Sequence, residues 1–238
     1  MRSAEQLHRQ VAQRLAQGRG FALATLNLDH LVKLRNDAKF AVAYSAQDLV
    51  TADGNPIVWV SKMAGTPVEL LPGSDLIIPL CEIAQAEGVA IGLAGSNQAS
   101  LEQAATELQK HVPGLMVASK IAPPMGFDPS SDAAAELLQS MADSGARLIF
   151  IALGAPKQEL LAARGRALLP NIGFASIGAG LDFLSGQQRR APSWVRRIAM
   201  EWLWRMMSDP RRLAKRYFFS ALILPGHMLR AFWVRVAG

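Results

Sequence analysis

The chain has 238 residues, a net charge of +6 and one cysteine, Cys81. Its length suits one large domain with a core of its own, and a lone cysteine excludes an internal disulfide and a cysteine-based metal cluster. The amino-terminal stretch lacks the apolar run that a signal peptide requires. Together with the cysteine usage, this indicates a cytoplasmic protein.

The positive charge is concentrated at the C-terminal end. Eleven basic and two acidic residues lie between Arg189 and Gly238, so this tail carries +9 and the rest of the chain −3. A basic tail is typical of proteins that bind nucleic acid or an anionic membrane surface. Its longest uncharged run, Tyr217 to Leu229, is shorter than the roughly 18 to 20 residues that cross a bilayer.

Short apolar runs alternate with helical patterns along the first 190 residues. We predict strands at residues 21–26, 48–51, 89–93, 115–118, 148–153 and 172–177, and helices at 3–17, 30–43, 74–86, 96–111, 131–144 and 157–169. This rhythm predicts an α/β fold, a mostly parallel Rossmann-like sheet with helices on both faces and ligands beyond the carboxyl ends of its strands. We expect an α/β core at residues 1–190 and a helical appendage at 191–238.

Polar residues follow the first two predicted strands. Thr25 and Asn27 lie on one side of the chain where the first strand ends, and Asp53 with Gly54 follows the second. A carboxylate in such a crevice can act as a general base towards a substrate hydroxyl, although Asp before Gly also forms ordinary turns. Thr25 and Asn27 can position a substrate or simply satisfy the loop backbone.

Three later strand ends are candidates for nucleotide binding. Gly154 and Lys157 belong to a strand-to-helix turn whose free amides favour an anion, although a plain surface turn has the same pattern. The turn with Gly95, Ser96 and Asn97 is only loosely like a phosphate-binding loop, and Ser96 or Asn97 can cap the following helix. After the sixth strand, Gly180 precedes Asp182, which can hold a nucleotide or cap a turn. With four scattered histidines and no D-x-D pair, we predict no metal site and no cofactor.

The tail contains two predicted helices. Residues 193–207 place Trp194, Ile198, Trp202 and Met206 on one face, and we expect that helix to pack on the core. From Pro210 onward, one face is basic (Arg211, Arg212, Lys215, Arg216) and the opposite face apolar (Leu213, Tyr217, Ala221, Leu224). Such a helix suits an anionic membrane surface. Since the aromatic rings lie apart from the arginines, the pattern favours lipid over nucleic acid.

Several short motifs, in this order, resemble the WecG/TagA/CpsF family of bacterial glycosyltransferases. They span about residues 25–217 and read Thr25-Leu-Asn27, Ala52-Asp53-Gly54, Leu153–Glu159, Gly178–Asp182 with Ser185-Gly186, Arg190-Ala-Pro192, Glu201–Arg205, and Pro210-Arg211 with Arg216-Tyr217. The segment Ala122–Phe127 is similar to the exopolysaccharide branch of that family, whose members also include N-acetylmannosaminyltransferases.

The resemblance implies inverting, metal-independent transfer from a UDP-sugar to a polyprenyl-diphosphate-linked sugar, on the cytoplasmic face of the membrane. It implies that Asp53 is the general base, that Thr25, Asn27 and Gln158 line the reacting pocket, and that Asp182 holds the nucleotide. It also implies that the appendage binds the membrane and supplies arginines to the diphosphate, for which Arg205, Arg212 and Arg216 are our candidates. The remaining candidates for nucleotide-sugar binding are Gly95, Ser96, Asn97, Gly154, Lys157 and Gly180.

Two other classes of function stay open from sequence alone. The same fold can serve as a non-catalytic module that binds a nucleotide sugar or a lipid, and the basic tail can bind nucleic acid. UDP-sugar turnover separates the first from an enzyme, and salt-sensitive oligonucleotide binding tests the second. The sequence also leaves a homo-oligomer open, as well as the identity of the donor sugar.

Overall fold

The computed structural model describes residues 1–188, 191–192, 194–195 and 199–237. In these residues an all-parallel six-stranded sheet has the order β2-β1-β6-β5-β3-β4. The strands are β1 (Phe21–Leu26), β2 (Leu49–Ala52), β3 (Ala90–Gly95), β4 (Val117–Ile121), β5 (Ala146–Ala152) and β6 (Gly173–Ser176). The predicted parallel α/β sheet is confirmed, with β1 at its predicted bounds and the other ends shifted by at most three residues.

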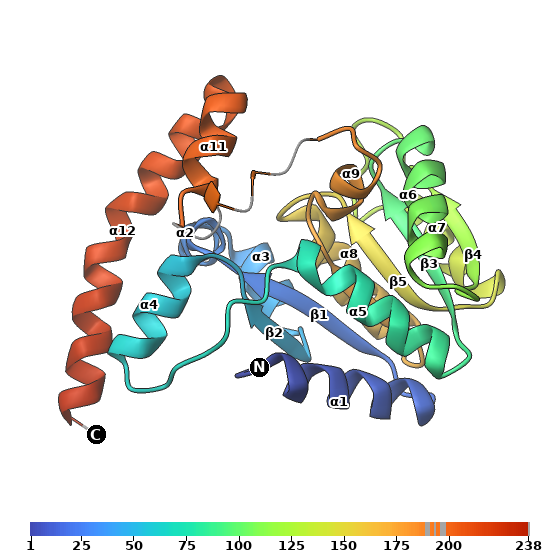
Figure 1. Ribbon diagram of the computed structural model, residues 1–238, viewed down its shortest axis with the longest axis horizontal. Helices are drawn as coiled ribbons and strands as arrows, with labels where there is room; N and C mark the ends of the chain where they lie inside the picture. The colour runs from blue at the N-terminus through green and yellow to red at the C-terminus, as the bar shows by residue number, and fades with distance from the viewer. Residues whose placement is uncertain (189–190, 193, 196–198, 238) are drawn as a thin grey trace.

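Helices cover both faces of the sheet (Figure 1). One layer holds α1 (Ala4–Ala16), α5 (Gly73–Ala86), α6 (Gln98–His111) and α9 (Gly180–Leu184). The other layer holds α2 (Leu28–Asn36), α3 (Ala38–Ser45), α7 (Asp132–Asp143) and α8 (Lys157–Leu168). Because both faces are covered, the central strands are largely apolar, and Leu23 of β1 and Phe150 of β5 are almost completely buried.

The predicted helix at residues 30–43 is wrong as a single helix. The chain leaves the helical conformation at Asp37, which has φ −132° and ψ 101°. The Asp37 side chain accepts a hydrogen bond from the amide of Phe40 at 3.0 Å, so it caps the start of α3. The resulting bend lets Phe40 and Tyr44 on α3 pack against Ala24 of the sheet.

A further helix, α4 (Asn55–Met63), follows Asp53 directly and was not predicted from the sequence. It begins at Gly54, whose φ of 106° lies in the region that favours glycine, and Pro56 occupies its first turn. Ile57 and Val58 are buried against Ala52 at the end of β2. The loop after the candidate base is therefore held in place by a packed helix.

The tail also differs from the prediction. Ala199 has φ 60°, a left-handed conformation that a continuous helix over residues 193–207 cannot contain, and α11 covers only Glu201–Ser208. Residues 193 and 196–198, which include Ile198, lie outside the described residues. The second helix begins at Pro210 as predicted and extends to Ala237 as α12. Trp202 of α11 stacks edge-on with Tyr217 of α12 at a ring distance of 6.0 Å.

Helix α12 packs along α2 and α4 (Figure 1). Three of the four residues of the face predicted to be apolar are turned inward, because Leu213 is buried and Tyr217 and Leu224 are partly buried, whereas Ala221 is exposed. Leu213, Tyr217 and Leu224 therefore face the protein, and not lipid as predicted for them. A second apolar stripe points outward instead, and its members are Phe218, Leu222, Leu229, Phe232, Trp233 and Val236. No helix of the described part of the chain is long and apolar enough to span a membrane.

The end of β3 depends on a glycine. Gly95 has φ 117°, and a Cβ atom there would lie 2.3 Å from the carbonyl oxygen of Ala152 on β5. We expect Gly95→Ala to lower the free energy of unfolding by about 3 kcal/mol or more, because left-handed strain and a backbone clash add. Urea unfolding measures this loss.

Gly88→Ala is the matched control for this prediction. Gly88 also has a positive φ, 64°, but nothing lies within 4 Å of the added Cβ. We expect a loss of only about 1 to 2 kcal/mol at this site, from backbone strain alone. Equal losses for the two variants would contradict the clash at Gly95.

Candidate functional site

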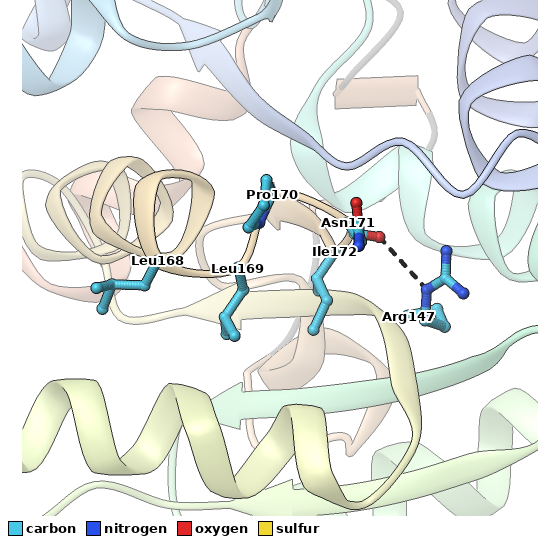
Figure 2. Close-up of a pocket in the computed structure, with 6 residues that line it drawn as sticks. All are labelled: Arg147, Leu168, Leu169, Pro170, Asn171 and Ile172. Carbon is cyan, nitrogen blue, oxygen red and sulfur yellow. Dashed lines mark hydrogen bonds between the residues drawn. The ribbon is translucent and has the colours of Figure 1, made fainter.

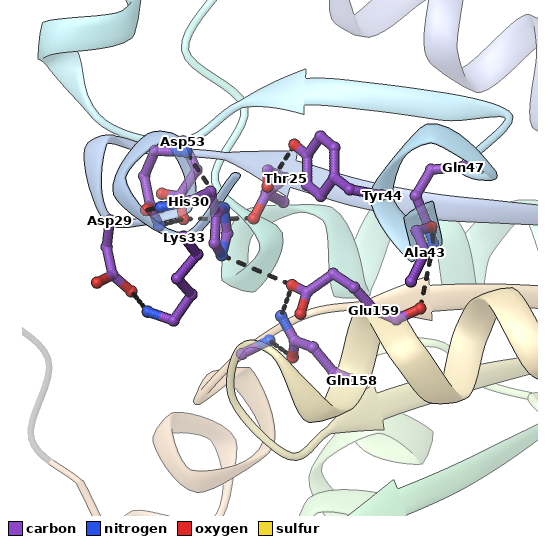
Figure 3. A network of polar contacts seen from close by, with 12 residues as sticks. Thr25, Asp29, His30, Lys33, Ala43, Tyr44, Gln47, Asp53, Gln158 and Glu159 are labelled. Atoms are coloured by element: carbon purple, nitrogen blue, oxygen red, sulfur yellow. Dashed lines mark hydrogen bonds and ion pairs between the residues drawn. The ribbon is translucent and has the colours of Figure 1, made fainter. Parts of the chain in front are cut away.

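Parallel pairing of β1 with β2 brings Thr25, Asn27 and Asp53 together. Leu26 pairs with Ala52, and the amide of Asp53 donates a hydrogen bond to the carbonyl of Leu26 at 2.8 Å. Asp53 Oδ2 then accepts from Asn27 Nδ2 at 3.3 Å and from Thr25 Oγ1 at 3.5 Å. Thr25 and Asn27 thus converge on the carboxylate of Asp53, and Figure 3 shows Thr25 beside Asp53.

The elements around this carboxylate fix its neighbours. Asn27 is the N-cap of α2, and its Oδ1 accepts from the amide of His30 at 3.1 Å. Thr25 is buried, and its carbonyl accepts a hydrogen bond from the Tyr44 hydroxyl at 3.1 Å. Since α2 and α4 both begin beside Asp53, the positive ends of two helix dipoles flank it. Both helix ends and both hydrogen bonds favour the ionised carboxylate, the form from which a general base takes up a proton.

Gln158 lies across from this group, in the first turn of α8. Its side chain is buried, with Nε2 donating to Glu159 Oε1 at 2.8 Å and Oε1 accepting from the amide of Gly178 at 3.0 Å. Glu159 in turn faces His30, whose Nε2 lies 3.6 Å from Glu159 Oε1 (Figure 3). Gln158 is therefore connected to Asn27 and Asp53 through two buried side chains.

Burial sets the protonation of two groups in this network. Desolvation raises the pKa of Glu159 to about 7, and the hydrogen bond from Gln158 offsets only part of that shift. Desolvation also raises the pKa of Tyr44, helped by the nearby carboxylates of Glu159 and Asp53. Tyr44 therefore keeps its proton at neutral pH and serves as a donor to Thr25.

A second polar cluster joins the ends of β3 and α9. Ser96 Oγ donates to Asp182 Oδ1 at 2.5 Å, and Gln188 Nε2 donates to Asp182 Oδ2 at 2.9 Å. Asn97 caps α6 by accepting from the amide of Ser100 at 3.0 Å, as predicted, and its Nδ2 donates to Gln187 Oε1 at 2.9 Å. The structure thus brings Ser96, Asn97 and Asp182 together, on the far side of β6 and β5 from Asp53.

The predicted glycines and lysine have different surroundings. Gly95 and Gly180 each allow a close approach, to the backbone of Ala152 at Gly95 and to the Ile77 side chain at Gly180, where a Cβ would lie 2.4 Å from Ile77 Cδ1. Gly154 is exposed with φ 70° and forms the turn before α8. No side chain in the described part caps the N-terminus of α8, where Lys157 is the first residue. The N-terminus of α8 thus places helix amides and a cation in one turn.

The proposed diphosphate arginines fall outside what the structure describes. The side chains of Arg205, Arg212 and Arg216 are not described, although α11 and α12 contain their backbones. Within the described residues, no group of three or more His, Cys, Asp or Glu side chains could hold a metal ion.

A surface hollow of about 330 Å³ lies at the opposite end of the sheet (Figure 2). It is lined by Arg147 at the start of β5 and by residues 168–172 before β6. Arg147 Nε donates to the carbonyl of Asn171 at 3.3 Å. Because it adjoins the amino ends of the strands, this hollow is separate from the candidate site.

Sequence reasoning missed His30 and Tyr44 as members of the site. His30 had a usable signal, because it follows the N-cap Asn27 by three residues, the spacing of a capping box. Its Nδ1 accepts from the amide of Asn27 at 3.3 Å. Tyr44 had no such signal, since it reaches Thr25 only through the packing of α3 on the sheet.

The buried Glu159 makes stability depend on pH. Its pKa is about 7 in the folded chain, against 4.5 ordinarily, so the folded state keeps a proton that the unfolded state loses as the pH rises. The contribution to stability is thus present below pH 4.5 and lost between pH 4.5 and 7. We expect Glu159→Gln to become more stable relative to the wild type over that interval, by on the order of 1 to 3 kcal/mol. Urea unfolding at pH 5, 6, 7 and 8 measures the gap, and a gap independent of pH would contradict the raised pKa.

Comparison with known proteins shows the family of the chain. The model of the glycosyl transferase WecG/TagA/CpsF family matches residues 1–237. A similar protein is the N-acetylglucosaminyldiphosphoundecaprenol N-acetyl-beta-D-mannosaminyltransferase of Bacillus spizizenii (strain ATCC 23059 / NRRL B-14472 / W23). It is 26% identical over 200 residues, which are 83% of this chain and 75% of the relative. The chain, with Thr25, Asn27 and Asp53 gathered at one edge of its parallel sheet, belongs to the WecG/TagA/CpsF family of glycosyltransferases.

Proposed function

We propose that this glycosyltransferase moves a sugar, with inversion, from a UDP-sugar to a sugar linked through diphosphate to a polyprenol. The observation that carries the proposal is the convergence of Asn27 and Thr25 on the carboxylate of Asp53, in a chain of this family. The name of the Bacillus relative supports a diphosphoundecaprenol-linked acceptor and an N-acetylmannosaminyl donor group. Such a reaction belongs to the synthesis of cell-surface or exopolysaccharide.

Asp53 acts as the general base in this proposal. Its carboxylate takes the proton of the acceptor hydroxyl while the hydroxyl oxygen attacks the anomeric carbon, and UDP leaves from the opposite face of the sugar. The hydrogen bonds from Asn27 and Thr25 hold the carboxylate in one orientation. Inversion follows from a single displacement.

The leaving nucleotide needs stabilisation of its negative charge. The uncapped N-terminus of α8 and Lys157 supply positive charge to it, and Asp182 with Ser96 holds the nucleoside by hydrogen bonds. Arg205, Arg212 and Arg216 of the appendage complete the diphosphate site in our proposal, because a guanidinium matches two phosphate oxygens at once. This reaction takes place at the cytoplasmic face of the membrane without a metal.

Asp53→Asn tests the assignment of the base. The amide keeps the shape of the side chain but cannot take a proton, so we expect turnover to fall about 100- to 10,000-fold with UDP binding retained. The assay follows product mass with UDP-N-acetylmannosamine and a GlcNAc-diphosphate lipid, in EDTA.

Asp143→Asn is the control, since this exposed carboxylate lies at the end of α7, away from the candidate site. Full turnover by Asp53→Asn would refute the assignment of Asp53 as the general base. Binding of UDP without turnover of a panel of UDP-sugars by the wild type would favour a non-catalytic nucleotide-sugar module.

We also propose that the outward stripe of α12 binds an anionic membrane surface. Phe218, Leu222 and Trp233 are each about 60% exposed, and large apolar side chains seldom gather on a helix face that is exposed to water. Arg211 and Lys215 are exposed at the N-terminal end of the same helix. Apolar side chains beside cations are the features of a helix that lies in the interface of an anionic bilayer.

Leu222→Glu with Trp233→Glu tests this surface. Inserting a carboxylate into the bilayer interface in place of each apolar side chain is unfavourable. We therefore expect at least a tenfold loss of co-sedimentation with phosphatidylglycerol vesicles. Leu168→Glu is the matched control, because Leu168 is 52% exposed but lies at the end of α8. Unchanged sedimentation of the double variant would sink the proposal, and tight binding to oligonucleotides instead would favour the nucleic-acid alternative.

A further inference from the structure

A buried pair, His30 and Glu159, lies between the two sides of the candidate site (Figure 3). Both side chains are almost fully buried, at 3% and 0% exposure. His30 belongs to the first turn of α2 and Glu159 to the first turn of α8. Neither residue has a role in the proposed reaction, so their joint burial beside the pocket needs its own explanation.

The hydrogen bonds of His30 determine which ring nitrogen carries the proton. Nδ1 accepts from the amide of Asn27 at 3.3 Å, so in the neutral ring the hydrogen is on Nε2. Nε2 faces Glu159 Oε1 at 3.6 Å. The ring therefore points its N–H towards the carboxyl group, and the rings of Phe40 and Tyr44 lie beside it in tilted arrangements at 5.9 and 6.0 Å.

Each end of this pair fixes the orientation of one pocket amide. Asn27 Oδ1 is engaged by the backbone amide of His30 at 3.1 Å, which turns Asn27 Nδ2 towards Asp53. The His30 ring holds the backbone of Asn27 in place for this contact, because its Nδ1 accepts from the Asn27 amide at 3.3 Å. Glu159 Oε1 is engaged by Gln158 Nε2 at 2.8 Å, which turns Gln158 Oε1 towards the amide of Gly178. A flipped amide at either residue would set like groups against each other, donor to donor or acceptor to acceptor.

Packing alone does not account for Glu159. Its Oε2 is buried without a hydrogen-bond partner among the described residues, and a buried carboxyl group without full pairing destabilises a fold. Its neighbours on α8, Leu161 and Ala162, are apolar and fully buried. The contact with His30 and Gln158 is what distinguishes its environment from theirs.

We propose that His30 and Glu159 are positioning residues that hold Asn27 and Gln158 in their working orientations on the two sides of the reacting pocket. The inference rests on the proposed role of Asp53, because Asn27 acts on the reaction through that carboxylate. The pair touches no reacting atom. It acts across the ends of β1 and β5, which the sheet itself keeps apart by one strand.

A double-mutant cycle tests this inference. We expect His30→Leu to lower kcat about 10- to 100-fold in the wild type but less than about threefold in an Asn27→Ala background, because its effect passes through Asn27. Glu159→Leu should show the same dependence on Gln158→Ala. Glu159→Gln should recover at least tenfold over Glu159→Leu, since its carbonyl oxygen can accept the hydrogen bond from Gln158 Nε2 and still face the N–H of His30.

Leu34→Ala is the matched control, since Leu34 lies on α2 and packs beside Phe40 and Tyr44 outside the pair. Its effect on kcat should be the same in both backgrounds. If His30→Leu lowered kcat by the same factor in the wild type and in the Asn27→Ala background, its role would be merely structural and the inference would be overturned. If His30→Leu fails to fold by circular dichroism, His30→Gln takes its place in the cycle.

A measurement without turnover tests the same pair. In the wild-type protein, the ¹⁵N shifts of the His30 ring at pH 7.5 should show hydrogen on Nε2 and none on Nδ1. A ring with hydrogen on Nδ1 would overturn the inference even if Asp53→Asn abolishes turnover. Conversely, full turnover by Asp53→Asn together with hydrogen on Nε2 would refute the base and leave the geometry of the pair intact.

Discussion

The candidate site depends above all on the register of β1 against β2. Leu26 is opposite Ala52, and the next amide, that of Asp53, donates to the Leu26 carbonyl at 2.8 Å. A slip by one residue would turn Asp53 to the other face and separate it from Asn27. Burial of side chains on both faces of the sheet secures this register. The packing of the core therefore also determines where the Asp53 carboxylate lies.

Much of this arrangement could be predicted because it is local in sequence. The strands follow from apolar runs, and Thr25, Asn27 and Asp53 follow from the rule that parallel strand ends share one edge. The break at Asp37 was equally local, since an Asp three residues before a buried Phe40 is an N-cap signal. It was missed because the apolar pattern continues across it.

Other features are set by tertiary packing and left no local pattern. The contact between His30 and Glu159 joins residues far apart in the chain, and it forms only because α3 packs on α8 and brings α2 close. The orientation of α12 was also not predictable, since Leu213 and Phe218 are equally apolar. Which of them faces inward depends on the surfaces of α2 and α4, and α4 itself has no strong signal besides Pro56.

Because α12 packs directly on α2 and α4, it also sets the distance between its own outward stripe and these two helices. Helices packed in this way have axes about 8 to 10 Å apart. A flat surface that touches the outward stripe is therefore separated from α2 and α4 by one helix diameter, and both helices begin beside Asp53. The chain needs no flexible tether to set the distance between such a surface and its carboxylate, because α12 is itself the spacer.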